Sequence, residues 1–263
     1  MSAPLPDTVD LAAQSYGKSG ETILVLHGLL GSGRNWSTIA KRLAERFRVI
    51  TLDLRNHGSS PWADAMTYPA MAADVRAYIE RNAIGPSTVI GHSMGGKTAM
   101  RLALDAPSLV ERLVVVDIAP VDYDHSTGEY VEALRRLDLN GLTSRNDVDA
   151  RLESDVPEPA IRAFLLQNLV RGDDGFTWRA NLEALASAMP DLMAFPTREH
   201  DGYRGPTLFL AGADSHYMQP GHRAIIDGLF AKADMRRIAD AGHWVHAEQP
   251  AAFLAHLQDF LKG

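Results

Sequence analysis

The sequence predicts an α/β fold in which a mostly parallel sheet carries helices on both faces. Short apolar runs alternate with helical patterns from Glu21 onward, which is typical of such a sheet. The apolar runs are continuous rather than alternating, as expected for strands that are buried on both faces. The alternation stops over residues 121–204, where only helical patterns occur, and then resumes. We therefore expect one sheet with a helical insertion.

The elements before this interruption follow one another in a regular order. Strands are expected at residues 22–27, 48–53, 88–92 and 113–117. Helices are expected at residues 36–46, 68–82 and 95–106. The last of these helices ends before Pro107, because a proline disfavours the helical conformation of the residue before it. A glycine-rich loop at residues 28–33 follows the first strand, and a loop rich in Gly, Ser, Asn and Pro follows the second at residues 54–65.

The second half of the chain completes the pattern. Within the interruption, helical patterns lie near residues 129–137, 146–154, 158–169 and 181–188. After it come a strand, a helix, a strand and a helix, at residues 207–211, 221–231, 235–238 and 250–261. The strands on either side need one another to form a sheet, so a separate C-terminal domain is not expected. The predicted organisation is an α/β core formed by residues 1–120 and 205–263, with a helical cap formed by residues 121–204.

The composition is that of a globular protein with an acidic surface. Hydrophobic residues make up 46% of the 263 residues and charged residues 22%, and the formal net charge is −7. Such a surface does not favour nucleic acid or anionic membranes as partners, because phosphate binding needs clustered lysine and arginine. The chain has no cysteine, no signal-peptide pattern in its first ten residues and no apolar run that could span a membrane. These features predict a cytoplasmic protein and say nothing of its oligomeric state.

A candidate nucleophile lies in Gly91-His92-Ser93-Met94-Gly95, which matches the pattern G-x-S-x-G. The pentapeptide alone also suits an ordinary turn serine. Its context is more specific, because a strand is expected before it and Gly95-Gly96 opens a helix after it. The glycines let the backbone of a tight turn approach its neighbours. We therefore expect Ser93 to act as a nucleophile near a helix N-terminus, where the helix dipole favours developing negative charge.

An oxyanion hole is expected in the loop after the first strand. His27-Gly28-Leu29-Leu30-Gly31 ends that strand and leaves backbone N–H groups outside the sheet. Acyl transfer needs such donors aimed at the tetrahedral oxyanion, and each is worth about 3–4 kcal/mol of barrier. The predicted donors are the N–H groups of Leu29 and Met94. A phosphate-binding loop is the alternative, but neither G-x-G-x-x-G nor a P-loop ending is present.

The general base is expected in the loop after the last strand. His243, in Ala241-Gly242-His243-Trp244, follows the expected strand at residues 235–238 and precedes the final helix. His246 is expected to begin that helix or to pack against it. His27, His57 and His92 lie near strand ends around the expected site and are candidates for orienting other groups.

Two aspartates fit the acid that orients the base. Asp117 ends the expected strand at residues 113–117, and Asp214 follows the expected strand at residues 207–211. Both satisfy the chain order serine, acid, histidine. One of them must be an ordinary loop carboxylate, and the residues alone leave both open.

Five motifs together resemble those of the α/β-hydrolase superfamily over nearly the whole chain. They are His27-Gly28-Leu29-Leu30-Gly31-Ser32, Asp53-Leu54-Arg55-Asn56-His57-Gly58, Gly91-His92-Ser93-Met94-Gly95-Gly96-Lys97-Thr98, Val116-Asp117-Ile118-Ala119-Pro120 and Ala241-Gly242-His243-Trp244-Val245-His246. Within this superfamily the chain most resembles small bacterial esterases related to abhydrolase domain-containing protein eleven. The resemblance implies the α/β-hydrolase fold, a helical cap inserted after the strand that ends at Asp117, and a carboxyl-ester or thioester hydrolase without cofactor or metal.

The resemblance also bears on the acid. Most of the superfamily places the acid three residues after the glycine that ends the later strand, and that position after Gly212 is Ser215. In relatives that place it one strand earlier, the acid follows the nucleophile by the spacing that separates Ser93 from Asp117, 24 residues. Asp117 is therefore the favoured acid and Asp214 the alternative.

The predicted function is a serine esterase that hydrolyses a small acyl ester, or an acyl thioester, through a Ser-His-Asp triad and an acyl-enzyme. Carbon–carbon bond hydrolases, lipases and perhydrolases share these residues and are alternatives. Dehalogenases and epoxide hydrolases use aspartate where this chain has Ser93, and a non-catalytic ligand-binding member would usually lack Ser93 or His243. Arg34, Arg55 and Lys97 are interpreted as solvated loop or helix charges, with contact to an anionic leaving group as the alternative. The apolar cap residues that are candidates for an acyl pocket or for the cap core are Phe164, Leu165, Leu169, Trp178, Leu182 and Met189.

Overall fold

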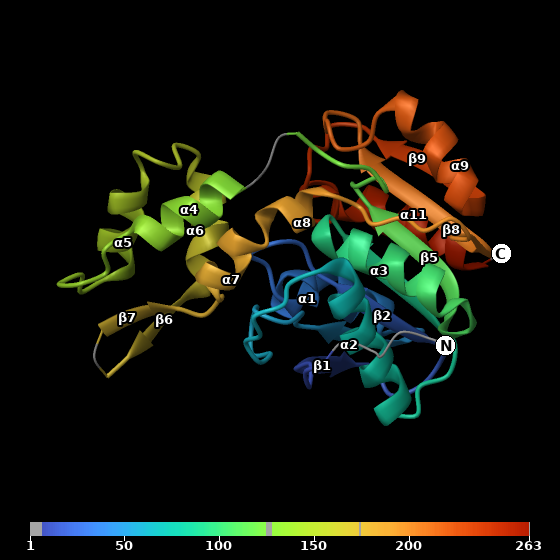
Figure 1. Cartoon of the computed structure of the whole chain (residues 1–263), viewed down its shortest axis with the longest axis horizontal. Helices are drawn as coiled ribbons and strands as arrows, with labels where there is room; N and C mark the ends of the chain where they lie inside the picture. Colours follow the sequence, from blue (N-terminus) through green and yellow to red (C-terminus); the bar gives the residue numbers. More distant parts are fainter. Residues whose placement is uncertain (1–6, 125–127, 174, 263) are drawn as a thin grey trace.

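The computed structural model describes residues 7–124, 128–173 and 175–262, and within them seven strands form one sheet (Figure 1). The strand order is β1-β3-β2-β4-β5-β8-β9. All neighbouring strands are parallel except β1 and β3. The strands are β1 (Ala13–Tyr16), β2 (Thr22–Leu26), β3 (Arg48–Leu52), β4 (Ser87–His92), β5 (Val110–Val116), β8 (Tyr203–Gly212) and β9 (Phe230–Ile238). The mostly parallel sheet that the sequence predicts is confirmed.

Both faces of this sheet are covered by helices. In β2, Ile23 and Val25 join the core that contains Phe253, whereas Leu24 and Leu26 join the core on the other face, which contains Met100. Successive side chains of a strand point to opposite faces, so a strand covered on both sides is apolar throughout. The helices of this part are α1 (Ser37–Leu43), α2 (Tyr68–Arg81), α3 (Met94–Asp105), α9 (Arg223–Leu229), α10 (Val245–Glu248) and α11 (Pro250–Lys262). The short 3-10 turns are η1 (Gly33–Trp36), η2 (Pro107–Leu109) and η4 (Pro220–His222).

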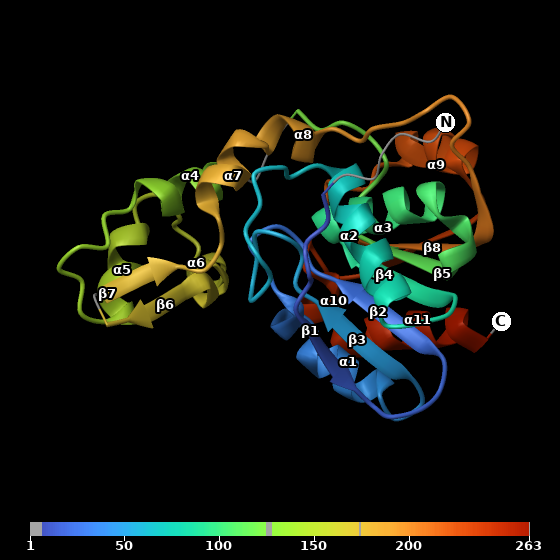
Figure 2. The same cartoon turned by 60° about the horizontal axis from the view of Figure 1, so that its bottom comes forward.

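The chain leaves the sheet after β5 and forms a group of helices to one side of it (Figures 1 and 2). These elements are α4 (Gly128–Arg136), α5 (Arg145–Leu152), α6 (Pro159–Leu165), η3 (Leu166–Asn168), α7 (Leu182–Ser187) and α8 (Met189–Met193). The expectation of helices alone is wrong in one place, because β6 (Leu169–Gly172) and β7 (Gly175–Trp178) form an antiparallel hairpin. The hairpin strands are short and mostly not buried, so they lack the apolar run by which a buried strand is recognised.

Two buried cations of α3 hold the segment that returns from this insertion to β8. Lys97 Nζ donates to the carbonyl oxygens of Met193 at 2.8 Å and Ala194 at 2.9 Å. One helical turn later, Arg101 forms an ion pair with Asp201 at 2.7 Å. Lys97 is 1% exposed and Arg101 is fully buried. The return segment is therefore fixed along α3 by side chains that contribute both charge and hydrogen bonds.

One strand of the sheet was not expected from the sequence. β1 pairs with β3 at the edge of the sheet, and three of its four residues are exposed. It therefore has no buried apolar run. Within the residues that the structure describes, no helix has both the length and the apolar character needed to cross a membrane. Residues 1–6, most of the stretch in which no signal peptide is expected, lie outside the described residues.

Candidate active site

Ser93 lies at the turn between β4 and α3, with φ 52° and ψ −118°. A positive φ at a residue other than glycine is strained and persists where the surrounding structure enforces it. Here the Ser93 N–H donates to the carbonyl oxygen of Val116 at 3.0 Å, which ties the turn to β5. Gly95 is required for the close approach, since a Cβ at this position would lie 2.5 Å from the carbonyl oxygen of His27. The expected strand–turn–helix context of Ser93 is present.

The structure brings His243 and Asp117 together. Nδ1 of His243 lies 2.7 Å from Oδ2 of Asp117. Asp117 follows β5 with φ 51° and is fully buried. Its Oδ1 accepts the N–H of Gly212 at 3.1 Å, and its Oδ2 also accepts the hydroxyl of Ser215 at 2.5 Å. The position three residues after Gly212 thus provides a hydroxyl donor to the carboxylate of Asp117.

Asp214, the alternative acid, lies elsewhere. Its backbone N–H donates to the carbonyl oxygen of Ala241 at 3.0 Å, and the residue is exposed. In the described part of the chain its carboxylate makes no hydrogen bond to His243. The structure therefore places Asp117, and not Asp214, beside the candidate base.

The ring of His243 is packed on one side and its backbone is fixed. The Tyr217 ring stacks on it, with the ring centroids 4.1 Å apart and the planes 29° from parallel. Nε2–H of His92 donates to the carbonyl oxygen of His243 at 2.8 Å. The next residue, Trp244, donates its N–H to Glu248 Oε1 at 3.0 Å. His243 therefore has little freedom to turn away from Asp117.

Two small cavities meet at Ser93. The Trp244 cavity, of about 40 Å³, is lined by Ser93 and His243 together with Leu29, Leu30, Gly31, Asn35, Trp36, Tyr130, Ile161, Phe164, Leu165, Trp244, His246 and neighbouring residues. The Tyr123 cavity, of about 20 Å³, is lined by Ser93, Leu29, Tyr68, Met94, Lys97, Ile118, Tyr123, Leu192, Met193 and Tyr217. Among the described residues, no hydrogen bond joins Ser93 Oγ to His243. Such bonds are often long before a substrate binds, and the two residues share one cavity wall.

The candidate acyl-pocket residues divide between cavity and core. Phe164 and Leu165 line the Trp244 cavity. Leu182 belongs to the hydrophobic core, while Trp178 and Met189 pack against it from partly buried positions. The remaining candidate, Leu169, lines a separate cleft.

The loop after β2 (residues 28–33), here called the oxyanion loop because it carries the predicted donor Leu29, is held by two buried histidines in a reciprocal arrangement. The N–H of Leu30, in the loop after β2, donates to Nε2 of His57 at 3.1 Å. The N–H of Leu54, in the loop after β3, donates to Nε2 of His27 at 2.9 Å. Each ring therefore accepts through Nε2 and carries its proton on Nδ1, which lies within 2.9 Å of a backbone carbonyl oxygen. The two loops are thereby fixed to each other.

The predicted oxyanion donors lie beside Ser93. Leu29 lines both cavities, and its N–H has no acceptor in the described part of the chain. Met94 is the first residue of α3, so its N–H is not used by the helix. Both N–H groups are therefore available at the edge of the candidate site.

Burial keeps the histidines around the loop neutral. Burial, with a smaller contribution from His27, lowers the pKa of His57 to about 3. Burial likewise holds the pKa of His92 well below its usual value, and the neighbouring His243 acts in the same direction. These histidine rings therefore act as neutral hydrogen-bonding groups at neutral pH. Burial also lowers the pKa of the Lys97 side chain, to about 7.

Three site features were not found from the sequence. The sequence favours solvated charges at Lys97 and Arg55, yet both side chains are buried, and Arg55 forms an ion pair with Asp74 at 2.6 Å. The sequence holds one indication that Lys97 is buried, because this lysine lies one helical turn after Ser93 on a helix whose residues are mostly buried. Nothing in the sequence indicates that the Tyr217 ring packs on His243.

Within the described residues, no group of three or more His, Asp or Glu side chains is arranged to hold a metal ion.

Comparison with known proteins identifies the family. Residues 23–256 match the model of the alpha/beta hydrolase family. The chain belongs to the α/β-hydrolase family. Two of its relatives are the sn-1-specific diacylglycerol lipase ABHD11 of Xenopus tropicalis and the esterase YbfF of Escherichia coli. The lipase is 44% identical to this chain, in an alignment that spans 97% of this chain and 82% of the lipase. The esterase is 35% identical, in an alignment that spans 91% of this chain and 92% of the esterase.

A solved structure, described as a marine microorganism esterase, has the same architecture. It is 36% identical and superposes with a TM-score of 0.93, covering 96% of this chain and 100% of that one. Because these relatives are named as esterases or lipases and share its fold, the chain is an ester hydrolase of the α/β-hydrolase fold.

Proposed function

We propose that this α/β-hydrolase is a serine esterase with Ser93 as nucleophile, His243 as general base and Asp117 as the group that orients the base. The proposal rests on the 2.7 Å contact between His243 Nδ1 and Asp117 Oδ2. The same histidine lines the Trp244 cavity together with Ser93. This contact holds the proton on Nδ1 and leaves Nε2 free to accept the proton of the serine hydroxyl.

The proposed reaction proceeds through an acyl-enzyme. Nε2 of His243 takes the proton of Ser93 Oγ as Oγ attacks the carbonyl carbon of the ester. The carbonyl oxygen becomes an oxyanion that accepts from the N–H groups of Leu29 and Met94. The tetrahedral intermediate expels the alcohol, which takes the proton from His243. A water molecule then repeats the sequence on the acyl-enzyme, which releases the carboxylic acid and restores Ser93.

The cavities suggest the kind of ester. The Trp244 cavity is lined by apolar side chains of the insertion, Ile161, Phe164 and Leu165. The Tyr123 cavity offers the rings of Tyr68 and Tyr123. Both are small, at about 40 and 20 Å³. We therefore expect esters with short apolar groups on both sides of the carbonyl to react faster than long-chain esters. Acyl thioesters and acylglycerols, the latter because one relative is named a diacylglycerol lipase, belong in the same assay.

The proposed domain organisation follows from the same cavities. We propose a core of residues 1–120 and 205–263, which carries Ser93, Asp117 and His243, and a cap of residues 121–204, except that Tyr203 and Arg204 already belong to the core strand β8. The cap contributes Tyr130 and the three apolar side chains named above to the wall of the Trp244 cavity, where they exclude water. A cytoplasmic location is proposed on the absence of cysteine.

A fluorophosphonate probe tests the proposal, because it labels a serine only when a base activates it. We expect the wild-type protein and the control Ser154→Ala, which alters an exposed serine of the insertion, to be labelled equally. Ser93→Ala is expected to abolish both labelling and the hydrolysis of a nitrophenyl acetate. Labelling that persists in Ser93→Ala, or a wild type that neither reacts with the probe nor hydrolyses any ester of the series, contradicts the proposal.

A further inference from the structure

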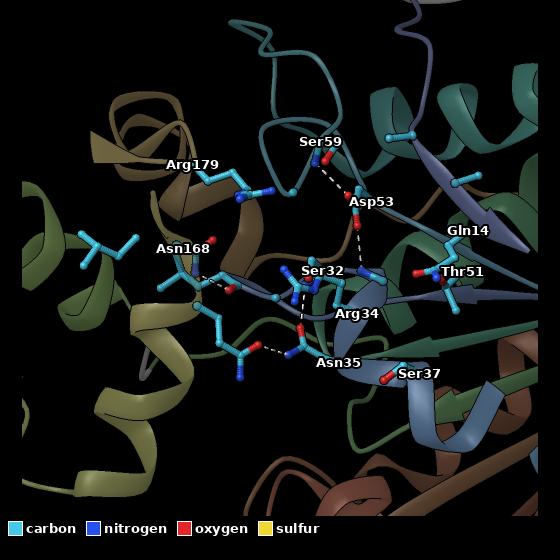
Figure 3. Close-up of a pocket in the computed structure, with 18 of the residues that line it drawn as sticks. Gln14, Ser32, Arg34, Asn35, Ser37, Thr51, Asp53, Ser59, Asn168 and Arg179 are labelled. Carbon is cyan, nitrogen blue, oxygen red and sulfur yellow. Dashed lines mark hydrogen bonds between the residues drawn. The ribbon is translucent and has the colours of Figure 1, made fainter. Parts of the chain in front are cut away.

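A third and much larger recess, here called the polar cleft, lies next to the candidate active site. It has a volume of about 860 Å³ and is lined from the sheet side by Arg34, Lys41 and Asp53, and from the insertion by Arg145, Asn168 and Arg179. Figure 3 shows Arg179 on the insertion side, facing the region of Arg34 and Asp53. Small-molecule sites typically measure about 300–1,000 Å³, so the polar cleft has the size of a binding site.

The charge of the polar cleft is opposite to that of the whole chain. Arg34, Lys41, Arg145 and Arg179 line it, and Asp53 is the one carboxylate among its described lining residues. The chain as a whole carries a formal net charge of −7. Four cations gathered in a recess of an acidic protein repel one another, so a complementary anion would stabilise the arrangement.

None of these four cations has a carboxylate partner in the part of the chain that the structure describes. The buried arginines elsewhere do, since Arg55 pairs with Asp74 at 2.6 Å and Arg101 with Asp201 at 2.7 Å. The cleft cations differ in that Arg34, Lys41 and Arg145 are exposed and Arg179 is half-buried, so their charges are open to a ligand in the polar cleft.

Arg179 shows most directly that an acceptor is missing. Its backbone is fixed, because its N–H donates to the carbonyl oxygen of Asn168 at 2.8 Å and its carbonyl oxygen accepts from Trp62 Nε1 at 3.0 Å. Its Nε is buried and has no hydrogen-bond partner among the described residues. A buried donor without an acceptor is unfavourable, so the guanidinium of Arg179 would gain an acceptor by turning toward an anion in the polar cleft that it lines.

The carboxylate of Asp53 is already satisfied. Its Oδ1 accepts the N–H of Gly33 at 2.7 Å, and its Oδ2 accepts the N–H of Ser59 at 2.7 Å (Figure 3). The two backbone donors hold the carboxylate against the loop, and among the described residues it makes no ion pair with the cleft cations. Four cations and one carboxylate line the polar cleft, so its lining keeps a net positive charge.

We propose that the polar cleft binds a small molecule that carries phosphate groups. Guanidinium groups match the oxygens of a phosphate in charge and geometry, and several phosphates in a row can meet cations from both walls. The neutral polar residues of the polar cleft, such as Gln14 and Ser32, suit the remainder of such a ligand. Leu30, Gly31 and Asn35 line both the polar cleft and the Trp244 cavity, so the ligand lies beside the oxyanion loop.

Titration calorimetry with inorganic pyrophosphate tests the proposal on the intact protein. We expect binding that weakens as the salt concentration rises from about 20 to about 200 mM, because added salt screens the cations. Arg145→Glu and Lys41→Glu should each weaken binding by about tenfold or more, which is about 1.4 kcal/mol. Arg151→Glu and Arg42→Glu make the same charge changes on the same helices outside the lining of the polar cleft and should change the affinity less than about twofold.

The four residues chosen for these substitutions are exposed, so the variants should fold, and thermal unfolding checks that they do. The proposal is overturned if wild-type protein does not bind pyrophosphate, or if the control variants weaken binding as much as the test variants. It is also overturned if citrate binds as tightly as pyrophosphate, which would show a site for any polyanion. Binding to vesicles of phosphatidic acid without binding of pyrophosphate would assign the cations to a membrane surface instead. Ser93→Ala should bind pyrophosphate as the wild type does, so this test does not depend on the proposed esterase activity.

Discussion

Asp117 and His243 are 126 positions apart in the chain, yet their side chains lie 2.7 Å apart. Asp117 follows β5, and His243 follows β9, with β8 between these two strands in the sheet. The contact therefore depends on the parallel arrangement of three strands, whose carboxyl ends meet at one edge of the sheet. Asp214 follows β8 and lies nearer to His243 in sequence, but it is exposed.

The assignment of the acid is tested by a pair of variants. Asp117→Asn should lower kcat for a nitrophenyl ester by about 10⁴, because the amide no longer holds the correct tautomer of His243. Asp214→Asn, which changes an exposed side chain, should leave kcat within about twofold of the wild type. A large loss in Asp214→Asn with near-normal turnover in Asp117→Asn would reverse the assignment.

His57 should influence catalysis without touching the substrate. His57→Leu removes the acceptor of the Leu30 N–H and loosens the loop that carries the Leu29 donor. We expect kcat to fall by about 10- to 100-fold with little change in KM, a smaller effect than the 10²–10³ seen when an oxyanion donor itself is removed. His57→Gln retains an acceptor oxygen and should recover part of the loss. Equal kcat values for His57→Leu and the wild type would exclude this positioning role.

The buried histidines should make the protein sensitive to acid. Burial lowers the pKa of both His57 and His246 to about 3, from an ordinary value of 6.5. Below pH 6.5 the unfolded chain therefore binds protons at these two rings that the folded chain does not bind. The contribution of the two neutral rings to the free energy of unfolding is complete above about pH 6.5 and is lost as the pH falls toward 3. Urea unfolding at pH 7.5, 6, 5 and 4 measures this loss.

His246 offers a controlled version of that experiment. Its ring stacks on Trp36 with the centroids 4.0 Å apart, and its Nδ1 is buried without a hydrogen-bond partner in the described part of the chain. His246→Phe keeps an aromatic ring and removes the titrating group, so stability should fall less steeply with acid. His200→Gln, at an exposed position, should leave the slope unchanged. An unchanged slope in His246→Phe would show that this ring does not contribute.

Lys97 should produce a dependence on pH in the alkaline range. Burial lowers its pKa to about 7, so between pH 7 and about 10.5 the unfolded chain binds a proton that the folded chain lacks. The stability of the wild type should therefore rise with pH in this window, relative to Lys97→Met. At pH 7 the variant should be destabilised by about 1–3 kcal/mol, because the carbonyl oxygens of Met193 and Ala194 lose their donor. Urea unfolding of both proteins at pH 7 and 9 measures the two effects, and parallel stability curves would contradict the first.

The features that the sequence predicts well are those that depend on the pattern of neighbouring residues in the chain. The buried strands are continuous apolar runs, and the turn around Ser93 occupies five adjacent positions between a strand and a helix. The edge strand β1 and the hairpin of β6 and β7 were missed because neither is buried enough to require such a run.

The remaining features depend on partners that are distant in the chain. The carbonyl oxygens that bind Lys97 lie 96 and 97 positions away, so a lysine on a helix could not be distinguished from a solvated one. The polar cleft is similar, since Arg34 and Arg179 meet only after the insertion folds back beside the loop after β2. The choice between Asp117 and Asp214 required the order of strands in the sheet.

With the proposed triad, the position of the insertion between β5 and β8 also sets when Ser93 can become reactive during folding. The turn that carries Ser93 precedes the insertion and can be placed by pairing of β2, β4 and β5. Asp117 is held by the backbone and side chains of β8 and the loop after it, and His243 follows β9, so both depend on β8 and β9 joining the sheet. Contacts over such long separations close late, because the loop entropy must first be overcome. A folding intermediate that lacks β8 and β9 would therefore hold an unactivated serine. The rate at which Ser93 gains reactivity toward a fluorophosphonate during refolding would report the last step of sheet assembly.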